Sequence, residues 1–329
     1  MMNYNCLTIP ISFLSGLFFI FLFKKLSGRF GIFKKDNGVS YLAGAAIFIS
    51  FFISLLAYSF LNRSNFAFSL VWIIFFALVF LVLEFFDDLR DFSLRPRLII
   101  QFVLIFTYLL FAKKIEIYFF PNWLNYILSF LWIMGISNAF NLLDIKDGLC
   151  GGVALITGLF FALISLLNGD VQLSVIYLAL TGSLFAFLAF NLPPAKIYMG
   201  NSGSHFLGFL FAALSMRGDY ATLNNPASIF IPVLLLAFPI IDTSYLIFQR
   251  IRKKILPLKK SNDHIFMHMI SNGFFEKKML LIIYSVTLLW CLVGLSIFRG
   301  VNILFFFCFA IAVFFSLIII ILAARAKKV

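Results

Sequence analysis

The chain has 329 residues, of which 63% are hydrophobic and 47 are phenylalanine, and its formal net charge is +13. Soluble domains are about 45–50% apolar, so this composition, with a mean hydropathy of +1.07, indicates an integral membrane protein. The basic residues form no stripe outside short loops, which argues against nucleic acid as a partner. The four cysteines include no CxxC pair, so neither a disulfide framework nor a zinc site is expected.

Apolar runs long enough to cross about 30 Å of hydrocarbon recur along the whole chain. They lie near residues 6–23, 39–61, 66–86, 98–112, 122–140, 151–168, 171–190, 204–216, 228–248, 279–298 and 301–323. The sequence therefore predicts an all-α, polytopic membrane protein with about eleven transmembrane helices. No polar segment is long enough to form a second domain, so a single domain over residues 1–329 is expected.

The charges of the loops predict how the chain is oriented in the membrane. The loops after every odd-numbered run, with the C-terminal tail, carry 21 of the 26 lysines and arginines. The positive-inside rule therefore places the N-terminus outside and the C-terminus in the cytoplasm. Four segments rich in carboxylates, amides, glycines and histidines fall on the same side, which predicts an active site that faces the cytoplasm.

The first of these segments ends the third apolar run with several carboxylates. Glu84, Asp87, Asp88 and Asp91 recur at helical spacings of three and four residues. Like charges at these spacings repel each other, so a divalent cation such as Mg²⁺ that removes the repulsion is one interpretation. The other is a charged helix end, in which the acids pair with Arg90, Arg95 and Arg97. The residues alone favour neither.

The second and third segments combine amides, hydroxyls and glycines. Asn138, Asn141 and Asp144 share a helical face, and Asp147 follows them. Such groups can ligate an ion or bind sugar hydroxyls and a base, whereas ordinary helix ends would account for one or two of them. Further on, small residues around Ser202 precede an apolar helix and could bind an anion or merely cap the helix. Tyr198 could stack on a base or anchor the chain at the membrane interface.

The fourth segment contains two histidines. His264 and His268 are four residues apart and are predicted to face the same way on a helix, where they could bind zinc or, as imidazolium ions, phosphate. Nearby lysines favour an anionic ligand or anionic lipid headgroups. Asp242 lies within the ninth run, so it is either functional or paired with Arg250 or Arg252. His205, which opens an apolar helix, is expected to be structural.

Together these segments resemble the polyprenyl-phosphate N-acetylhexosamine-1-phosphate transferases, a branch of glycosyltransferase family 4. The resemblance rests on "DDLRD…RPRLIIQ" (87–101), "NAFNLLDIKDGLCGG" (138–152), "PPAKIYMGNSGSHFLGF" (193–209) and "DHIFMHMISNGF" (263–274), which occur in family order. It implies transfer of N-acetylhexosamine-1-phosphate from a UDP-sugar to undecaprenyl phosphate, with Mg²⁺ or Mn²⁺ as cofactor and UMP as by-product. It also implies a bacterial inner-membrane location and membrane lipid as a partner, and it allows a homodimer.

The resemblance assigns roles to particular residues. The catalytic residues implied are Asp87, Asp88 and Asp147; the substrate-binding residues are Lys35, Asn138, Asn141, Asp144, Tyr198, Ser202, His264 and His268; the metal ligands are Asp88, Asp144 and Asn201.

The sequence departs from the family pattern at several positions. Asn201 replaces the aspartate of the usual G-D-x-G-S, and Ile145 replaces a glycine in the usual D-G-x-D-G. Phe266 and Met267 stand where many members have further histidines, so the segment is closer to the enzymes of surface-polysaccharide pathways than to the phospho-N-acetylmuramoyl-pentapeptide transferases. Three alternatives stay open: a catalytically impaired relative acting as a partner, a membrane prenyltransferase and a secondary transporter.

Overall fold

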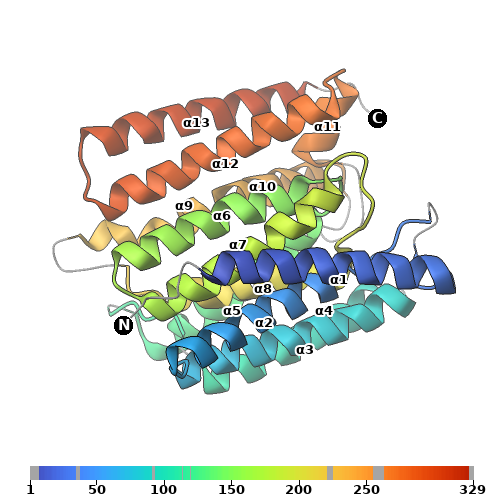
Figure 1. The fold of residues 1–329 in the computed structure, drawn as a ribbon. Coiled ribbons are helices and arrows are strands. Elements are labelled where there is room, and N and C mark those ends of the chain that lie inside the picture. Colours follow the sequence, from blue (N-terminus) through green and yellow to red (C-terminus); the bar gives the residue numbers. More distant parts are fainter. Residues whose placement is uncertain are drawn as a thin grey trace. The chain divides into compact units, whose positions relative to one another are not determined.

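The computed structural model describes residues 7–34, 38–90, 93–112, 114–118, 120–220, 225–254 and 263–325. Over these residues the structure contains helices and no strand, which confirms the predicted all-α class (Figure 1). The helices are α1 (Thr8–Phe30), α2 (Ala43–Asn62), α3 (Phe68–Arg90), α4 (Leu94–Phe111), α5 (Asn122–Leu143), α6 (Leu149–Leu167), α7 (Val171–Asn191), α8 (Gly200–Arg217), η2 (Pro226–Phe230), α9 (Ile231–Leu235), α10 (Ala237–Arg252), α11 (Ile265–Ser271), α12 (Glu276–Phe298) and α13 (Ile303–Ala324).

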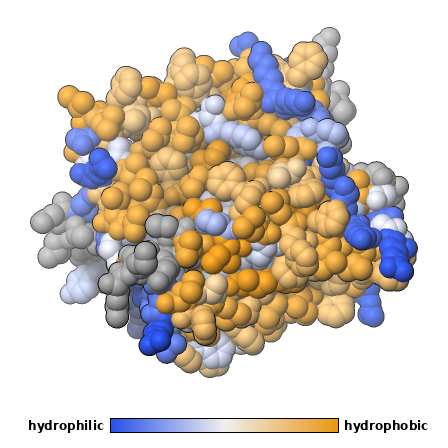
Figure 2. Space-filling model, in the orientation of Figure 1, coloured by the Kyte–Doolittle hydropathy of each residue, from blue (hydrophilic) through white to orange (hydrophobic). Residues whose placement is uncertain are grey.

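Most of these helices are suited to a membrane. In the part of the chain that the structure describes, eight are long and apolar enough to cross one, and a ninth span results if η2–α9 and α10, bent by 66°, count together. The helices α4 and α8, which occupy the two shortest predicted runs, are not among them. Hydrophobic side chains cover most of the face seen in Figure 2. The chain is therefore a multi-pass membrane protein, while the count of eleven and the orientation of the termini stay predictions.

The chain divides into two compact units, Met1–Asp219 and Tyr220–Val329. The first contains α1 to α8 and the second contains η2 and α9 to α13. The single domain predicted over residues 1–329 stays a prediction.

The helix α8 is the centre of the first unit. Every residue from Ser202 to Met216 is buried, and α8 packs against α2, α3 and α5 (Figure 1). Helices in a membrane associate through small residues that let their backbones approach closely. At Gly208 an added Cβ would lie 2.6 Å from Cα and 3.0 Å from the carbonyl oxygen of Ser137 on α5. This contact sets how closely α5 and α8 approach each other.

A proline explains the bend in the second unit. Pro239 lies in the first turn of α10, and its ring conflicts with continued helix at residue 235, four positions earlier. The helix α9 accordingly ends at Leu235. The carbonyl oxygen of Leu235 receives a weak contact from Cys291 Sγ of α12, 3.9 Å away. The bend is therefore specified by the sequence and stabilised by packing against α12.

We expect Gly208→Ala to lower the stability of the protein in detergent by about 1–3 kcal/mol, because the new methyl group meets backbone atoms that cannot rotate away. Thermal unfolding in detergent micelles would measure the change. Gly135→Ala on the facing helix α5 is the matched control, since no atom lies within 4 Å of its added Cβ. Equal melting temperatures for both variants would contradict the close α5–α8 contact.

Candidate active site

Asp88 and the start of α8 form the first part of the site. The two carboxylate oxygens of Asp88, in the last turn of α3, accept hydrogen bonds from the backbone N–H groups of Asn201 and Ser202, each at 2.9 Å. These N–H groups have no partner within their own helix, and the helix dipole favours an anion there. The anion expected at this segment is thus Asp88 itself in this structure. The substrate-binding role of Ser202 stays a prediction.

Gly200 makes this contact sterically feasible. Its φ of +78° lies in the left-handed region, which residues with a side chain rarely adopt. A Cβ on Gly200 would also lie 2.8 Å from Oδ2 of Asp88. Both the backbone conformation and the close approach of the carboxylate therefore require glycine at this position.

Asp87 is buried beside Asp88 and has two partners of its own. Its Oδ2 accepts hydrogen bonds from the Arg97 guanidinium of α4 and from Asn201 Nδ2, the latter at 3.1 Å. Only 1% of Asp87 is exposed, so the cation offsets an otherwise costly buried charge. The pairing of a helix-end acid with an arginine, one of the two interpretations of this segment, is therefore seen at Arg97. Asp91 lies outside the described residues.

A second layer of buried polar groups lies one turn behind the aspartates. Gln101 Nε2 donates to Glu84 Oε1 at 2.7 Å, and Gln101 Oε1 accepts from Asn138 Nδ2 at 3.1 Å. The ring nitrogens of His205 are 3.3 and 3.4 Å from Gln101 Nε2. Glu84 and Gln101 thus repeat the pairing of Asp87 and Arg97, because each pair joins α3 to α4. In this layer Glu84, Gln101 and His205 are buried, whereas Asn138 is half-buried.

The remaining predicted residues of the first unit lie on α5 and in the segments next to α6 and α8. Asn141 Oδ1 accepts a hydrogen bond from Ser204 Oγ of α8 at 3.1 Å. Asp144 is the C-cap that follows α5, and Asp147, on the turn to α6, accepts from the backbone N–H of Ala195 at 2.8 Å. The backbone N–H of Tyr198 donates to the carbonyl oxygen of Ser40 at 2.7 Å. The carboxylate of Asp147 therefore holds the chain that leads into α8.

Asp87, Asp88, Asn201 and Ser202 are in direct contact, and Asn141 joins this network through Ser204, whose hydroxyl also donates to the carbonyl oxygen of Asn201. Asn138 belongs instead to the layer around Gln101. Lys35 lies outside the described residues. Sequence reasoning missed Gln101, although a glutamine within an apolar run, four residues after Arg97, is the signal that could have identified it.

The two histidines of the second unit differ from each other. His264 precedes α11 with extended backbone, so only His268 lies on that helix and the two do not share a helical face. His264 Nδ1 is 2.9 Å from Asp242 Oδ2, whereas His268 Nδ1 is 2.7 Å from the Tyr245 hydroxyl. Burial lowers the pKa of His268, although the nearby Asp263 carboxylate acts in the opposite direction. The lowered pKa favours the neutral form of His268.

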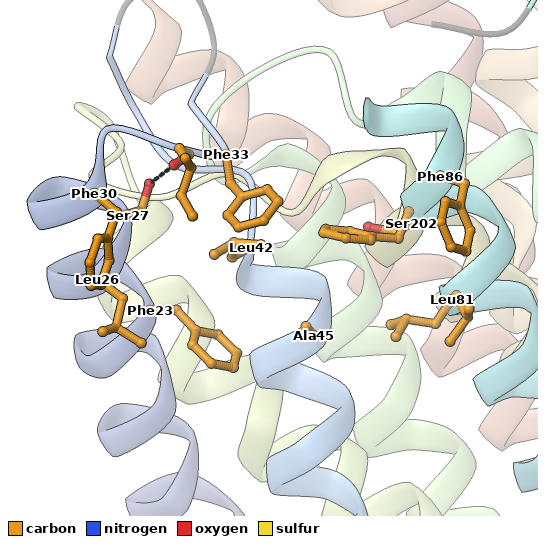
Figure 3. Close-up of a pocket in the computed structure, with 13 residues that line it drawn as sticks. Phe23, Leu26, Ser27, Phe30, Phe33, Leu42, Ala45, Leu81, Phe86 and Ser202 are labelled. Atoms are coloured by element: carbon orange, nitrogen blue, oxygen red, sulfur yellow. Dashed lines mark hydrogen bonds between the residues drawn. The ribbon is translucent and has the colours of Figure 1, made fainter. Parts of the chain in front are cut away.

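An apolar groove of about 540 Å³ lies between α1, α2 and α3 and reaches Ser202 of the first unit. In Figure 3, Phe23 and Leu26 of α1 lie across from Leu81 of α3, with Ala45 of α2 between them. Because Ser202 also donates its N–H to Asp88, the groove ends beside the aspartate pair. A ligand with an apolar chain and an anionic head would match this combination.

Comparison with known proteins decides the family. A curated relative, the probable undecaprenyl-phosphate N-acetylglucosaminyl 1-phosphate transferase of Bacillus subtilis, is 31% identical over 259 residues, which are 76% of this chain and 71% of the relative. Residues 69–219 match the family model described as Glycosyl transferase family 4. The chain belongs to glycosyl transferase family 4. The match runs from α3 to α8, the helices that carry the site of the first unit.

Other family 4 relatives carry related names. The undecaprenyl-phosphate alpha-N-acetylglucosaminyl 1-phosphate transferase of Thermotoga maritima is 31% identical over 226 residues, covering 67% of this chain and 68% of the relative. The phospho-N-acetylmuramoyl-pentapeptide-transferase of Staphylococcus saprophyticus is 27% identical over 288 residues, covering 80% and 86%. The resemblance drawn from the sequence motifs is therefore confirmed.

We expect Gln101→Leu to destabilise the protein by about 1–3 kcal/mol, because the buried Glu84 carboxylate loses its amide donor. The double variant Glu84→Leu/Gln101→Leu leaves no unpaired carboxylate and should cost less than Gln101→Leu alone. Unfolding in a graded series of denaturing detergent would compare the two. A double variant that is less stable than the single one would refute the pairing of Glu84 with Gln101.

Proposed function

We propose that the chain transfers N-acetylhexosamine-1-phosphate, with N-acetylglucosamine as the first sugar to test, from a UDP-sugar to undecaprenyl phosphate. The products are undecaprenyl-diphospho-N-acetylhexosamine and UMP. The observation that carries this proposal is the contact of two adjacent aspartates at the end of α3 with the first turn of α8, in a chain of family 4. The relatives' names supply the acceptor and the sugar.

The reaction is a phosphoryl transfer between two anions. An oxygen of the lipid phosphate attacks the phosphorus that carries the sugar, the bond from that phosphorus to the oxygen of UMP breaks, and UMP leaves. Little covalent chemistry is asked of the protein, so rate enhancement comes from positioning and from neutralising charge. Arg97 already supplies one positive charge at Asp87, which leaves further phosphate charge to be balanced when the substrates bind.

Mg²⁺ is the cofactor we propose. The described residues contain no group of three or more His, Cys, Asp and Glu side chains that could hold a metal ion. They do bring two carboxylates and the Asn201 amide together, and hard oxygen donors in this small number fit Mg²⁺, which takes its other ligands from water and substrate phosphates. Of the ligands that the family resemblance implies, Asp88 and Asn201 belong to this group, and Asp144, the C-cap of α5, is the third. These residues would hold the ion, which when bound would supply charge neutralisation at the diphosphate.

The lipid acceptor and the soluble donor set the location of the reaction. The groove between α1, α2 and α3 is apolar and ends at Ser202 (Figure 3), so a membrane-embedded substrate can approach the aspartates from the side. A nucleotide sugar is dissolved in water and must arrive from the aqueous phase. We therefore assign the protein to the bacterial inner membrane, with the site on the cytoplasmic side that the loop charges favour.

The purified chain should release UMP from UDP-N-acetylglucosamine when undecaprenyl phosphate and Mg²⁺ are supplied, and chelation of the metal should stop the release. We expect Asp87→Asn and Asp147→Asn each to lower kcat by at least about 100-fold, because each removes a charge that positions the site. Asp170→Asn is the matched control: Asp170 caps α7, asparagine is an equally good cap, and UMP release should stay unchanged. No release from any UDP-N-acetylhexosamine would refute the proposal.

Asn201→Asp tests the metal site directly. The change replaces an amide donor to Asp87 with a third carboxylate, so without Mg²⁺ the protein should melt at a lower temperature than the wild type. Added Mg²⁺ should then raise the melting temperature of the variant more than that of the wild type. Asn201→Ala removes the same hydrogen bond without adding charge and should not gain sensitivity to Mg²⁺. Equal metal responses in all three proteins would exclude a metal site at Asn201.

A further inference from the structure

We propose that Asp242 is a positioning residue that holds the proton of neutral His264 on Nδ1, so that a second proton taken up at Nε2 is the one donated to a phosphate oxygen of the substrates. The inference deepens the proposed function, on which it rests together with the substrate-binding role that the family resemblance implies for His264. It concerns only residues of the second unit, and the contacts between them are given by the structure.

The buried carboxylate of Asp242 contacts both the His264 ring and the backbone N–H of Ile265. Asp242 and His264 are each 2% exposed. Oδ2 of Asp242 lies 2.9 Å from Nδ1 of His264, and Oδ1 accepts the backbone N–H of Ile265 at 3.0 Å. An ionised carboxylate only accepts hydrogen bonds, so Nδ1 must carry a proton. Neutral His264 is therefore the Nδ1–H tautomer, with its lone pair on Nε2.

The same carboxylate also holds the ring in place. Ile265 is the first residue of α11, and its N–H has no acceptor within that helix. By binding this N–H and the adjacent imidazole together, Asp242 fixes both the backbone position and the rotation of His264. Partners of this kind are known to orient histidines that act on a metal or a substrate, and their loss typically costs about 10–100-fold.

The contrast with His268 shows that this arrangement is specific to one histidine. His268 faces the Tyr245 hydroxyl through Nδ1, and its Nε2 is 3.6 Å from Asp263. A hydroxyl can donate or accept, so it does not fix which nitrogen of His268 carries the proton. Asp263 in turn pairs with Lys253. The carboxylate nearest to His264 is therefore much closer, at 2.9 Å, than the one nearest to His268, at 3.6 Å.

The tautomer matters because the leaving UMP gains negative charge at one oxygen. With Nδ1–H directed to Asp242, a proton bound at Nε2 gives an imidazolium whose charge is balanced by the carboxylate on one side. The Nε2–H group then donates to a phosphate oxygen on the other side. If the proton of neutral His264 were moved from Nδ1 to Nε2, the ring would no longer face a carboxylate through Nδ1–H. An imidazolium formed at His264 would then lose the negative charge that balances it.

Asp242→Asn provides the test because an amide has only one oxygen. The buried N–H of Ile265 cannot shift its proton, whereas an imidazole can carry its proton on either nitrogen, so the amide oxygen should stay with Ile265. The amide NH₂ then faces His264 Nδ1, which must become an acceptor. We expect the neutral ring to switch to the Nε2–H tautomer and kcat for UMP release to fall by about 10–100-fold, with a smaller change in KM for the UDP-sugar.

The full chain contains three histidines, so ¹⁵N-histidine labelling of the protein in detergent gives a simple spectrum. His264→Gln assigns the signal of His264, and spectra in alkaline buffer, where imidazole is neutral, report its tautomer. Asp263→Asn is the matched control, since it removes the neighbouring acid and should leave the tautomer of His264 unchanged. Asp242→Ala removes the helix contact as well, so only this variant should also lose thermal stability markedly.

A double-mutant comparison separates positioning from a purely structural role. In a His264→Gln background, Asp242→Asn should cost no further activity, because Asp242 acts through His264. An Nδ1–H tautomer retained in Asp242→Asn, or an equal further loss of activity in the His264→Gln background, would overturn the inference. If the wild type released no UMP, the proposed function would fail, whereas the tautomer of His264 would still be decided by its spectrum.

Discussion

The site of the first unit depends on the hydrogen bonds between the Asp88 carboxylate and the first turn of α8. A carboxylate beside a membrane is costly unless its charge is satisfied, and a helix start offers unpaired N–H groups and a favourable dipole. Each therefore satisfies the other. Because α8 is buried from Ser202 onward and packs against α2, α3 and α5, this contact joins the end of α3 to the centre of the unit.

The chain uses carboxylates in the same way elsewhere. Asp147 accepts the N–H of Ala195, Asp170 caps α7, and Asp242 accepts the first N–H of α11. At the site of the first unit, Asp88 and Asp147 are already bound to backbone donors and Asp87 is bound to Arg97. A metal ion would therefore need substrate phosphates as further ligands. In this scheme the metal site is complete only when the substrates are bound.

The sequence predicted the helices well but not the pairings between them. Long apolar runs suffice to place most helices, whereas the "GNSGS" segment, predicted to precede a helix, forms the first turn of α8. The layer formed by Glu84 and Gln101 depends on how α3 and α4 are aligned side by side, which no local pattern encodes. The shared face predicted for His264 and His268 was wrong because Asp242, distant in sequence, binds the N–H of Ile265 and starts α11 after His264. Local spacing identifies which residues are unusual, whereas tertiary contacts decide their orientation.

Asn201 shows how one departure from the family pattern changes the energetics of the site. Its side-chain amide donates to Asp87 while its backbone N–H binds Asp88, so it satisfies both aspartates without a cation. The backbone N–H of an aspartate at this position could still bind Asp88, but its side chain could not donate to Asp87. Its carboxylate would repel Asp87 until a metal ion bound. If the proposed site binds Mg²⁺, asparagine would make the metal-free site more stable and would reduce the gain from binding the ion. The hydrogen bonds of Asn201 keep the two aspartates in contact without a cation.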